Sequence, residues 1–153
     1  MQVRRGTLED VPAITALVQG LEGWFDEHAR ATAIPTDVKH QTVFVAAEGE
    51  ELLGFVSLYV MEGRLNIGWI GVRRDWHRRG VGSALMARAE AHARELGLGT
   101  LAVYTLGDGV DYEPYERTRQ FYFKHGFRIR RRSKTDSEAC PELIDLAKQV
   151  GLE

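Results

Sequence analysis

The sequence predicts an α/β fold of the α+β type: a mixed, mainly antiparallel sheet of about seven strands with helices on both faces. Two kinds of segment alternate along the chain. Some have the alternating or continuous apolar residues of strands, and others repeat apolar residues at helical spacing. Three consecutive strand segments are separated only by tight turns, which is typical of an antiparallel meander. No repeat or Pro/Gly/Ser-rich linker interrupts the 153 residues, so we expect a single domain over residues 1–153.

The first predicted helix covers residues 7–20 and follows a short strand, QVRR. Thr7 is a typical N-terminal capping residue, acids occupy the first turn, and Gly20 ends the segment. Its apolar positions predict a core face made of Val11, Ile14, Leu17 and Val18. The next segment, EGWFDEHARA, mixes aromatic and acidic residues with weak helical character. We expect a mobile helix or loop there.

The meander consists of the strands TVFVAAE, ELLGFVSLYVM and RLNIGWIGV. Turn signals at Gly49-Glu50 and Glu62-Gly63 connect them. A helix follows at 81–96 and ends at Gly97. Its predicted core face contains Leu85, Ala89, His92, Ala93 and Leu96.

The last third of the chain begins with TLAVYTL, a nearly continuous apolar strand of the kind found where both faces of a sheet are covered. A helix then extends from Pro114, in its first turn, to Gly126. FRIRRRSK follows as a strand that alternates its side chains, placing Arg131 on one face and on the other Arg128, Arg130, Arg132 and Lys134. The local pattern of the tail, ELIDLAKQV, slightly favours a helix over a strand.

Charge and cysteine content narrow the function classes. The net charge of −2 lacks the basic excess of a nucleic-acid binder, so nucleic acid is an unexpected partner. Nucleic acid remains an alternative partner because the strand 128–134 is basic. That strand has no interleaved aromatic residues on which bases could stack. The single cysteine, Cys140, and the absence of zinc-ligand spacing predict a reducing compartment and no metal. Acids and a proline interrupt the N-terminal segment, which fits neither a signal peptide nor a membrane span; we expect a cytoplasmic protein without membrane contact.

The stretch DWHRRGVGSALM joins the last meander strand to the helix at 81–96. A glycine pair at such a junction lets backbone N–H groups point at one anion, and the helix N-terminus adds a partial positive charge. A P-loop would need a lysine followed by Ser or Thr after Gly82, where Ser83 and Ala84 stand. A dinucleotide fingerprint would need Gly or Ala at Leu85 and a parallel βαβ unit. Both nucleotide motifs are therefore excluded.

Two motifs resemble the GNAT superfamily of acyl-CoA-dependent N-acetyltransferases. The pyrophosphate motif of that family, Q/R-x-x-G-x-G/A after the fourth strand, reads HRRGVG at 77–82, with His77 in place of Gln or Arg. The second motif, an aromatic-Tyr pair followed by Gly-Phe at a helix end, is matched by FYFKHGF at 121–127. The family architecture also favours a strand for ELIDLAKQV, and we adopt that prediction.

The resemblance implies transfer of an acetyl group from acetyl-CoA to a primary amine by direct attack. The pantetheine would insert like an extra strand where the fourth and fifth strands diverge, and one backbone N–H of the fourth strand would polarise the thioester carbonyl. The pyrophosphate would bind at the amides from Arg78 to Ser83. The cofactor-binding residues implied in this way are Ile70, Val72, Arg78, Arg79, Gly80, Val81, Gly82 and Ser83.

Tyr122 occupies the family position of the general acid that protonates the departing thiolate, and it is our one predicted catalytic residue. Relatives often carry a glutamate on the fourth strand as general base, where this chain offers only Asn66, so no base is assigned. The remaining acids near the expected cleft are Asp26, Glu27, Asp108, Asp111 and Glu113.

Aromatic residues at Trp24, Phe25, Tyr112 and Tyr115, together with those acids, predict an acceptor pocket for a cation with an apolar body. The acceptor itself, a small molecule or a peptide or protein, is not identified. Since Asn66 and His77 depart from the family pattern, a non-catalytic acyl-CoA-binding module is the alternative function. A homodimer is the possible oligomer, because dimers are the most frequent oligomers of soluble proteins.

Overall fold

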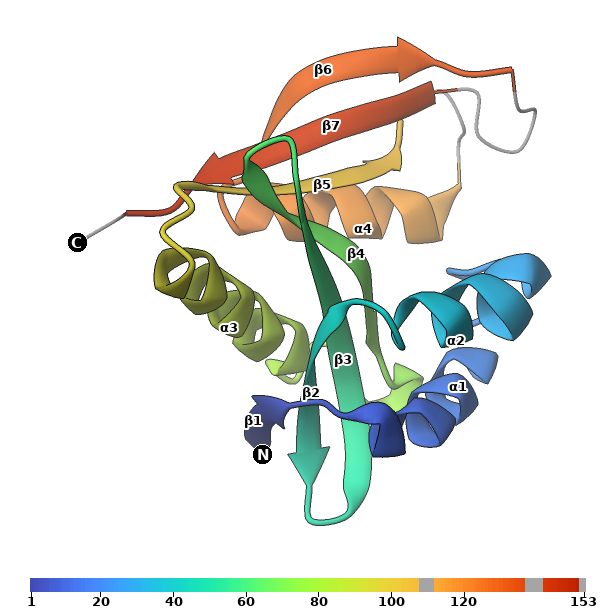
Figure 1. The fold of residues 1–153 in the computed structure, drawn as a ribbon. Coiled ribbons are helices and arrows are strands. Elements are labelled where there is room, and N and C mark those ends of the chain that lie inside the picture. Colours follow the sequence, from blue (N-terminus) through green and yellow to red (C-terminus); the bar gives the residue numbers. More distant parts are fainter. Residues whose placement is uncertain (108–111, 137–141, 152–153) are drawn as a thin grey trace.

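Seven strands form one sheet (Figure 1). They are β1 (Gln2–Arg5), β2 (Thr42–Glu48), β3 (Glu51–Met61), β4 (Arg64–Val72), β5 (Thr100–Leu106), β6 (Arg128–Lys134) and β7 (Glu142–Gln149). In the computed structural model, which describes residues 1–107, 112–136 and 142–151, their order is β1-β2-β3-β4-β5-β7-β6. Neighbouring strands are antiparallel except β4 and β5, which are parallel. This sheet confirms the predicted fold class.

Helices cover both faces of the sheet and create two separate cores. α1 (Val11–Gln19) and α2 (Ile34–Asp37) pack on the face that contains Phe55. α3 (Val81–Glu95) and α4 (Glu113–Lys124) pack on the face that contains Val56 and Leu146. Thr7 caps the first helical turn, and Ile14, Leu17 and Val18 are buried, as predicted. The segment expected to be a mobile helix or loop includes the start of one turn of π-helix at Ala29–Ala33, which leads into α2.

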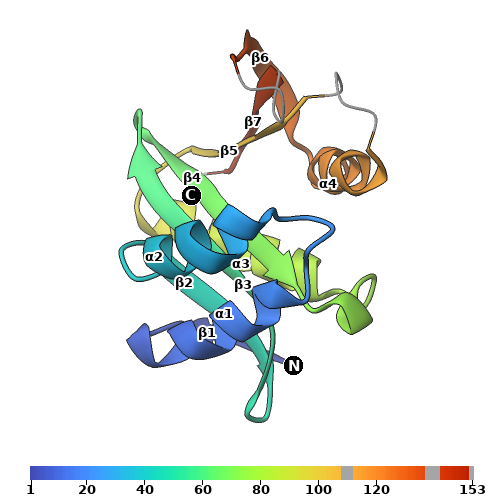
Figure 2. The same ribbon diagram turned by 90° about the vertical axis from the view of Figure 1, so that its right-hand side faces the viewer.

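The parallel strands β4 and β5 diverge along their length. They pair only at Leu65–Ile67 and Leu101–Val103, although β4 continues to Val72 and β5 to Leu106. Figure 2 shows the result: β1 to β4 form one group, and β5, β6, β7 and α4 form another. The backbone groups of the second half of β4 therefore have no neighbouring strand on this side.

A β-bulge lies in β4 at the point of divergence. Ser57 of β3 lies opposite Trp69 and Leu58 lies opposite Ile67, so Gly68 is the extra residue. The Trp69 N–H donates to the buried Ser57 hydroxyl at 2.9 Å rather than to a strand carbonyl. A side chain at Gly68 would lie within 3 Å of that hydroxyl, so glycine is required here.

The tail Glu142–Gln149 is a strand, and the helical preference of its local pattern is wrong. β7 lies between β5 and β6 and pairs with both, so ladder hydrogen bonds on two sides outweigh local propensity. The two meander turns lie where they were predicted. No helix in the described residues is long and apolar enough to cross a membrane.

Two predictions about side-chain direction are wrong. Leu96 is 47% exposed because α3 ends one residue before it, and Val81 and Met86 are buried in the core instead. In β6, a bulge at Arg130 interrupts the alternation: Ile129 lies opposite Leu146, and Arg131 lies opposite the next residue, Asp145. The basic side chains of β6 therefore do not form the single stripe that the sequence suggested.

Candidate active site

The loop between β4 and α3 has the backbone conformation of an anion site. Arg78 has φ = +62° and Gly80 has φ = +86°, so two left-handed residues lie within one turn of the helix start. A non-glycine residue such as Arg78 adopts this conformation at a cost, and such strain clusters at ligand sites. Loops with alternating handedness turn successive N–H groups toward one concavity. α3 begins at Val81, and its first-turn N–H groups have no partner within the helix.

The four arginines of this loop divide into two pairs. Arg73 is held by Glu51 and Asp75, and Arg74 lies near Glu22 and over the ring of Trp24. Arg78 and Arg79, in contrast, are exposed and form no ion pair with any described residue. Arg79 is stacked on Trp76, with 3.9 Å between its guanidinium carbon and the ring centroid. Two guanidinium groups are thus available to an external anion.

His77 acts on the backbone of β4. Its Nε2 donates a hydrogen bond to the Val72 carbonyl oxygen at 2.8 Å, and its ring packs edge-on against Trp24. The side chain at this departure from the family motif therefore braces the end of β4 against the loop.

The first turn of α3 is packed against the end of α4. A Cβ on Gly82 would lie 3.0 Å from the ring of Phe121, so Gly82 permits close helix packing. The Nδ1–H of His125 donates to the Phe121 carbonyl at 2.9 Å, which leaves Nε2 to accept from the Ser83 hydroxyl at 3.1 Å. This contact orients the Ser83 side chain. It does not involve the backbone N–H of Ser83, which lies in the first turn of α3.

Ile70 and Val72 direct their backbone groups toward the divergence of β4 and β5. The N–H groups of Trp69 and Arg73 point to β3, where they donate to Ser57 and Leu53. Because alternate residues of a strand point to opposite sides, Ile70 and Val72 point away from β3. The structure thus brings these two residues, the loop 78–80 and the first turn of α3 to one end of the divergence.

Tyr122 lies on α4, facing the sheet, and is only 3% exposed. Its ring packs between those of Phe121 and Phe127, at centroid distances of 5.5 and 5.4 Å. Burial raises the pKa of the Tyr122 hydroxyl far above its ordinary value. The phenol therefore keeps its proton at neutral pH, as a general acid must.

The acids considered in the sequence do not form a base cluster in the described residues. Asp26 accepts from the Ala29 N–H at 2.8 Å, and Glu113 pairs with Arg117. Asp108 and Asp111 lie outside the described residues, and so does Cys140. No group of three metal-ligating side chains occurs among the residues that the structure describes.

Asn66, at the family position of the base, is buried and has a structural role. Its amide nitrogen donates to the Met61 and Arg64 carbonyls, each at 3.1 Å, and its oxygen accepts from Arg64 Nε at 3.0 Å. Arg64 in turn forms a buried ion pair with Asp145 of β7. This pair was not predicted from the sequence, although single charged residues within apolar strands were a visible signal.

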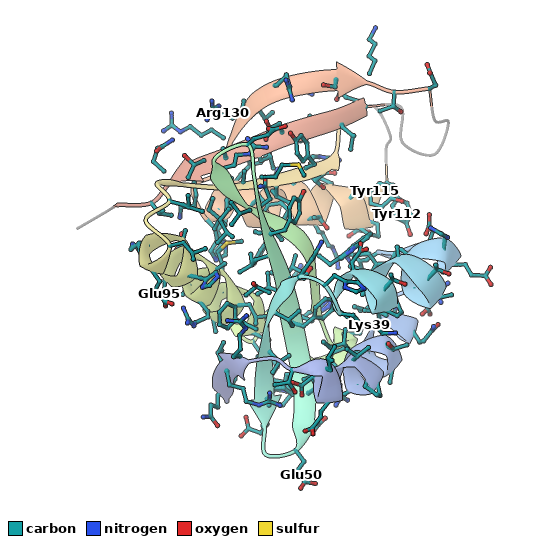
Figure 3. All side chains as sticks on the ribbon, in the orientation of Figure 1. Lys39, Glu50, Glu95, Tyr112, Tyr115 and Arg130 are labelled. Atoms are coloured by element: carbon teal, nitrogen blue, oxygen red, sulfur yellow. The ribbon has the colours of Figure 1, made fainter. Side chains whose placement is uncertain are left out.

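Aromatic side chains connect the α1–α2 segment with the start of α4. The Tyr112 hydroxyl donates to the Gly23 carbonyl at 2.9 Å, and its ring contacts Tyr115 at 4.6 Å. In Figure 3 both tyrosines lie between α4 and α2. Phe25 packs edge-on against Trp69, whose Nε1 donates to Asp37. These rings lie beside the divergence of β4 and β5, but the nearby acid Asp37 is already engaged.

Comparison with solved structures finds the same fold in acetyltransferases. A protein from Desulfovibrio desulfuricans assigned to the GNAT family superposes with a TM-score of 0.83 at 23% identity, covering 98% of this chain and 99% of that one. The ribosomal-protein-S18-alanine N-acetyltransferase of Escherichia coli gives 0.75 at 16% identity, covering 99% and 95%. An aminoglycoside 6'-N-acetyltransferase complexed with coenzyme A gives 0.77 at 16% identity, covering 100% and 99%.

A comparison with curated proteins finds no significant match to the sequence. The family model described as an acetyltransferase (GNAT) domain, however, matches residues 39–129, more than half of the chain. That match includes β4, the loop 73–80, α3 and Tyr122. The chain therefore belongs to the GNAT acetyltransferase family and is an acyltransferase.

Proposed function

We propose that this protein transfers an acetyl group from acetyl-CoA to a primary amine by direct attack, and that residues 1–153 act as one catalytic domain. The observation that carries this proposal is the pair of left-handed residues, Arg78 and Gly80, at the start of α3 beside the divergence of β4 and β5. Backbone amides from Arg78 to Ser83 would bind the pyrophosphate, with Arg78 and Arg79 contributing charge.

The backbone of Ile70 and Val72 would pair with the pantetheine amides. In a tetrahedral transition state, negative charge develops on the thioester oxygen, and an N–H of this pair would stabilise it. The Val72 carbonyl is engaged by His77, which supports a fixed position for this end of β4. Tyr122 would donate its proton to the departing sulfur. The attacking amine must arrive neutral, and no side chain is assigned to remove its proton.

Calorimetric titration with acetyl-CoA tests the site without knowledge of the acceptor. Gly80 and Gly49 both have positive φ and open space around an added Cβ, so Gly80→Ala and Gly49→Ala impose similar backbone strain. An alanine in the left-handed conformation costs about 1 kcal/mol or more. Gly80→Ala places this strain in the loop and should weaken acetyl-CoA binding roughly tenfold. Gly49→Ala should bind as the parent protein does.

No saturable acetyl-CoA binding by the folded protein would contradict the proposal, as would equal binding by the two glycine variants and the parent. Binding followed by thiol release with any amine of a broad panel supports transfer. Binding without turnover on that panel would favour the acyl-CoA-binding module instead.

A further inference from the structure

A polar pocket of about 430 Å³ lies at the tip of the β3–β4 hairpin, apart from the loop 73–80. It is lined by the turn residue Glu62, by Arg64, Thr100 and Asp145, and by Arg130 and Arg131 of β6. Figure 3 shows Arg130 beside the hairpin tip. Strand register places Arg64, Asp145 and Arg131 on the face of the sheet against which α1 and α2 pack farther down.

The β6 bulge brings two arginines to this pocket. Consecutive strand residues normally point to opposite faces, yet Arg130 and Arg131 both line the same cavity. The extra residue at Arg130 accounts for this, because a bulge redirects the side chain at that position. The pocket thus gains a second guanidinium group that regular pairing would have pointed away.

One wall of the pocket is a buried ion pair that is electrically neutral. Arg64 is 8% exposed and Asp145 is 6% exposed, and their two contacts measure 3.1 Å from Nη1 to Oδ2 and 2.9 Å from Nη2 to Oδ1. Asn66 holds the third nitrogen, Nε, of this guanidinium. The charge of Arg64 is therefore matched by Asp145 and adds little net attraction for a ligand.

Arg130 and Arg131 have no such counter-charge. Within residues 1–107, 112–136 and 142–151, neither forms an ion pair or hydrogen bond through its side chain. The remaining acid, Glu62, approaches the Tyr104 hydroxyl at 3.4 Å and Arg64 at 3.9 Å. The pocket consequently offers two unmatched guanidinium groups against one carboxylate, and it favours an anion with several acceptor oxygens.

The location separates this pocket from the CoA phosphates and connects it to the acceptor side. Thr100 lies shortly after the C-terminal end of α3, a helix of 15 residues and about 22 Å whose other end adjoins the loop 73–80. Tyr104 is the first residue of β5 beyond its pairing with β4. Asp145 lies opposite Tyr104 and Arg131 lies opposite Asp145. Two strand spacings, roughly 10 Å, thus separate Arg131 from the start of the divergence.

We propose that this pocket binds an acidic group, a carboxylate or a phosphate, of the amine acceptor. The proposal rests on the proposed acetyl transfer, and it specifies acceptors with an acid at least roughly 10 Å from the reactive nitrogen. It differs from the cationic acceptor expected from the sequence, and two of the acids behind that expectation, Asp26 and Glu113, are engaged within the protein.

The kinetic test compares ω-amino carboxylates from 4-aminobutanoate to 10-aminodecanoate with alkylamines of equal length, using acetyl-CoA and thiol detection. The acids should have a lower KM, with an optimum where the nitrogen and carboxylate are at least roughly 10 Å apart. Arg130→Gln/Arg131→Gln should raise KM for the acids about tenfold and leave the alkylamines unchanged. Arg128→Gln/Lys134→Gln removes the same charge from β6 outside the pocket and should change neither.

A binding test separates failure of this proposal from failure of the proposed function. Titrations of glutarate and of inorganic phosphate are run with excess coenzyme A, which occupies the loop 73–80. They should saturate with the parent protein and with Arg128→Gln/Lys134→Gln but not with Arg130→Gln/Arg131→Gln. Aminoalkyl phosphates of the same lengths then distinguish the two acid groups. Normal acetyl-CoA binding with no saturable anion binding, or equal KM for acids and alkylamines, overturns the pocket assignment. Anion binding without acetyl-CoA binding overturns the proposed function, and with it the acceptor role.

Discussion

Two arginine-rich segments of this protein have similar composition and different structure. The loop 73–80 contains four arginines, and β6 contains four arginines and a lysine. In the loop, left-handed residues turn backbone N–H groups toward one concavity, and two arginines are paired internally. In β6 the backbone pairs with β7, and only side chains redirected by a bulge reach a pocket. Backbone conformation, rather than the number of arginines, therefore determines which groups each segment presents: backbone N–H groups in the loop and side chains in β6.

The largest expected difference between the two segments concerns stability. Asp145→Asn leaves Arg64 buried beside the β6 pocket without its counter-charge, which should lower the free energy of unfolding by about 3–5 kcal/mol. Asp75→Asn removes one of the two partners of Arg73 in the loop, where both groups are partly solvated, and should cost no more than about 1 kcal/mol. Urea unfolding of both variants measures the contrast. Equal losses would show that Arg64 is solvated in solution.

The second prediction concerns the protonation of the departing thiolate, for which neither arginine-rich segment supplies the donor. Tyr122→Phe retains the packed ring and removes the proton donor, so kcat should fall about 100-fold while the acetyl-CoA affinity stays the same. Because burial raises the pKa of Tyr122, the parent enzyme should keep its proton donor up to at least pH ~10, with no alkaline loss of kcat from this group below that. Unchanged kcat in the variant would remove Tyr122 from the mechanism.

The smallest expected effect sharpens the contrast between backbone and side-chain binding. Arg78→Gln/Arg79→Gln should weaken acetyl-CoA binding by about 1 kcal/mol, since the backbone amides remain and these exposed charges are screened. The loss should shrink in 0.5 M salt, an ionic strength at which the Debye length is only about 4 Å. Calorimetry with the β6 variant Arg128→Gln/Lys134→Gln, which should bind acetyl-CoA normally, is the control. Complete loss of acetyl-CoA binding by the folded variant would mean that the arginine side chains, rather than the backbone amides, supply most of the binding energy.

Much of the fold could be predicted from sequence because its signals are local. Turn residues, a capping threonine and apolar periodicity located the first helix, the meander, α3 and α4. For the tail at 142–149, the local pattern favoured a helix and the family architecture favoured a strand. Pairing with β5 on one side and β6 on the other makes it a strand. Local propensity contains no information about such neighbours.

The candidate site was predictable to the extent that it depends on short motifs. The glycines at 80 and 82 and the tyrosine at 122 were visible in the sequence, and the structure shows distinct reasons for the two glycines: positive φ at Gly80 and contact with Phe121 at Gly82. The role of His77 on the Val72 carbonyl was not visible, because it depends on how the loop folds back onto β4.

Local sequence specifies the kinds of element, most of their boundaries and the family motifs, since these follow from residues within one turn or a few positions of one another. Tertiary structure alone decided where β4 and β5 diverge, which arginines remain unpaired, and that Arg64 meets Asp145 from 81 residues away. It also decided, through single inserted residues at Gly68 and Arg130, where backbone and side chains point. These features depend on contacts between distant segments, whose energies no local pattern encodes.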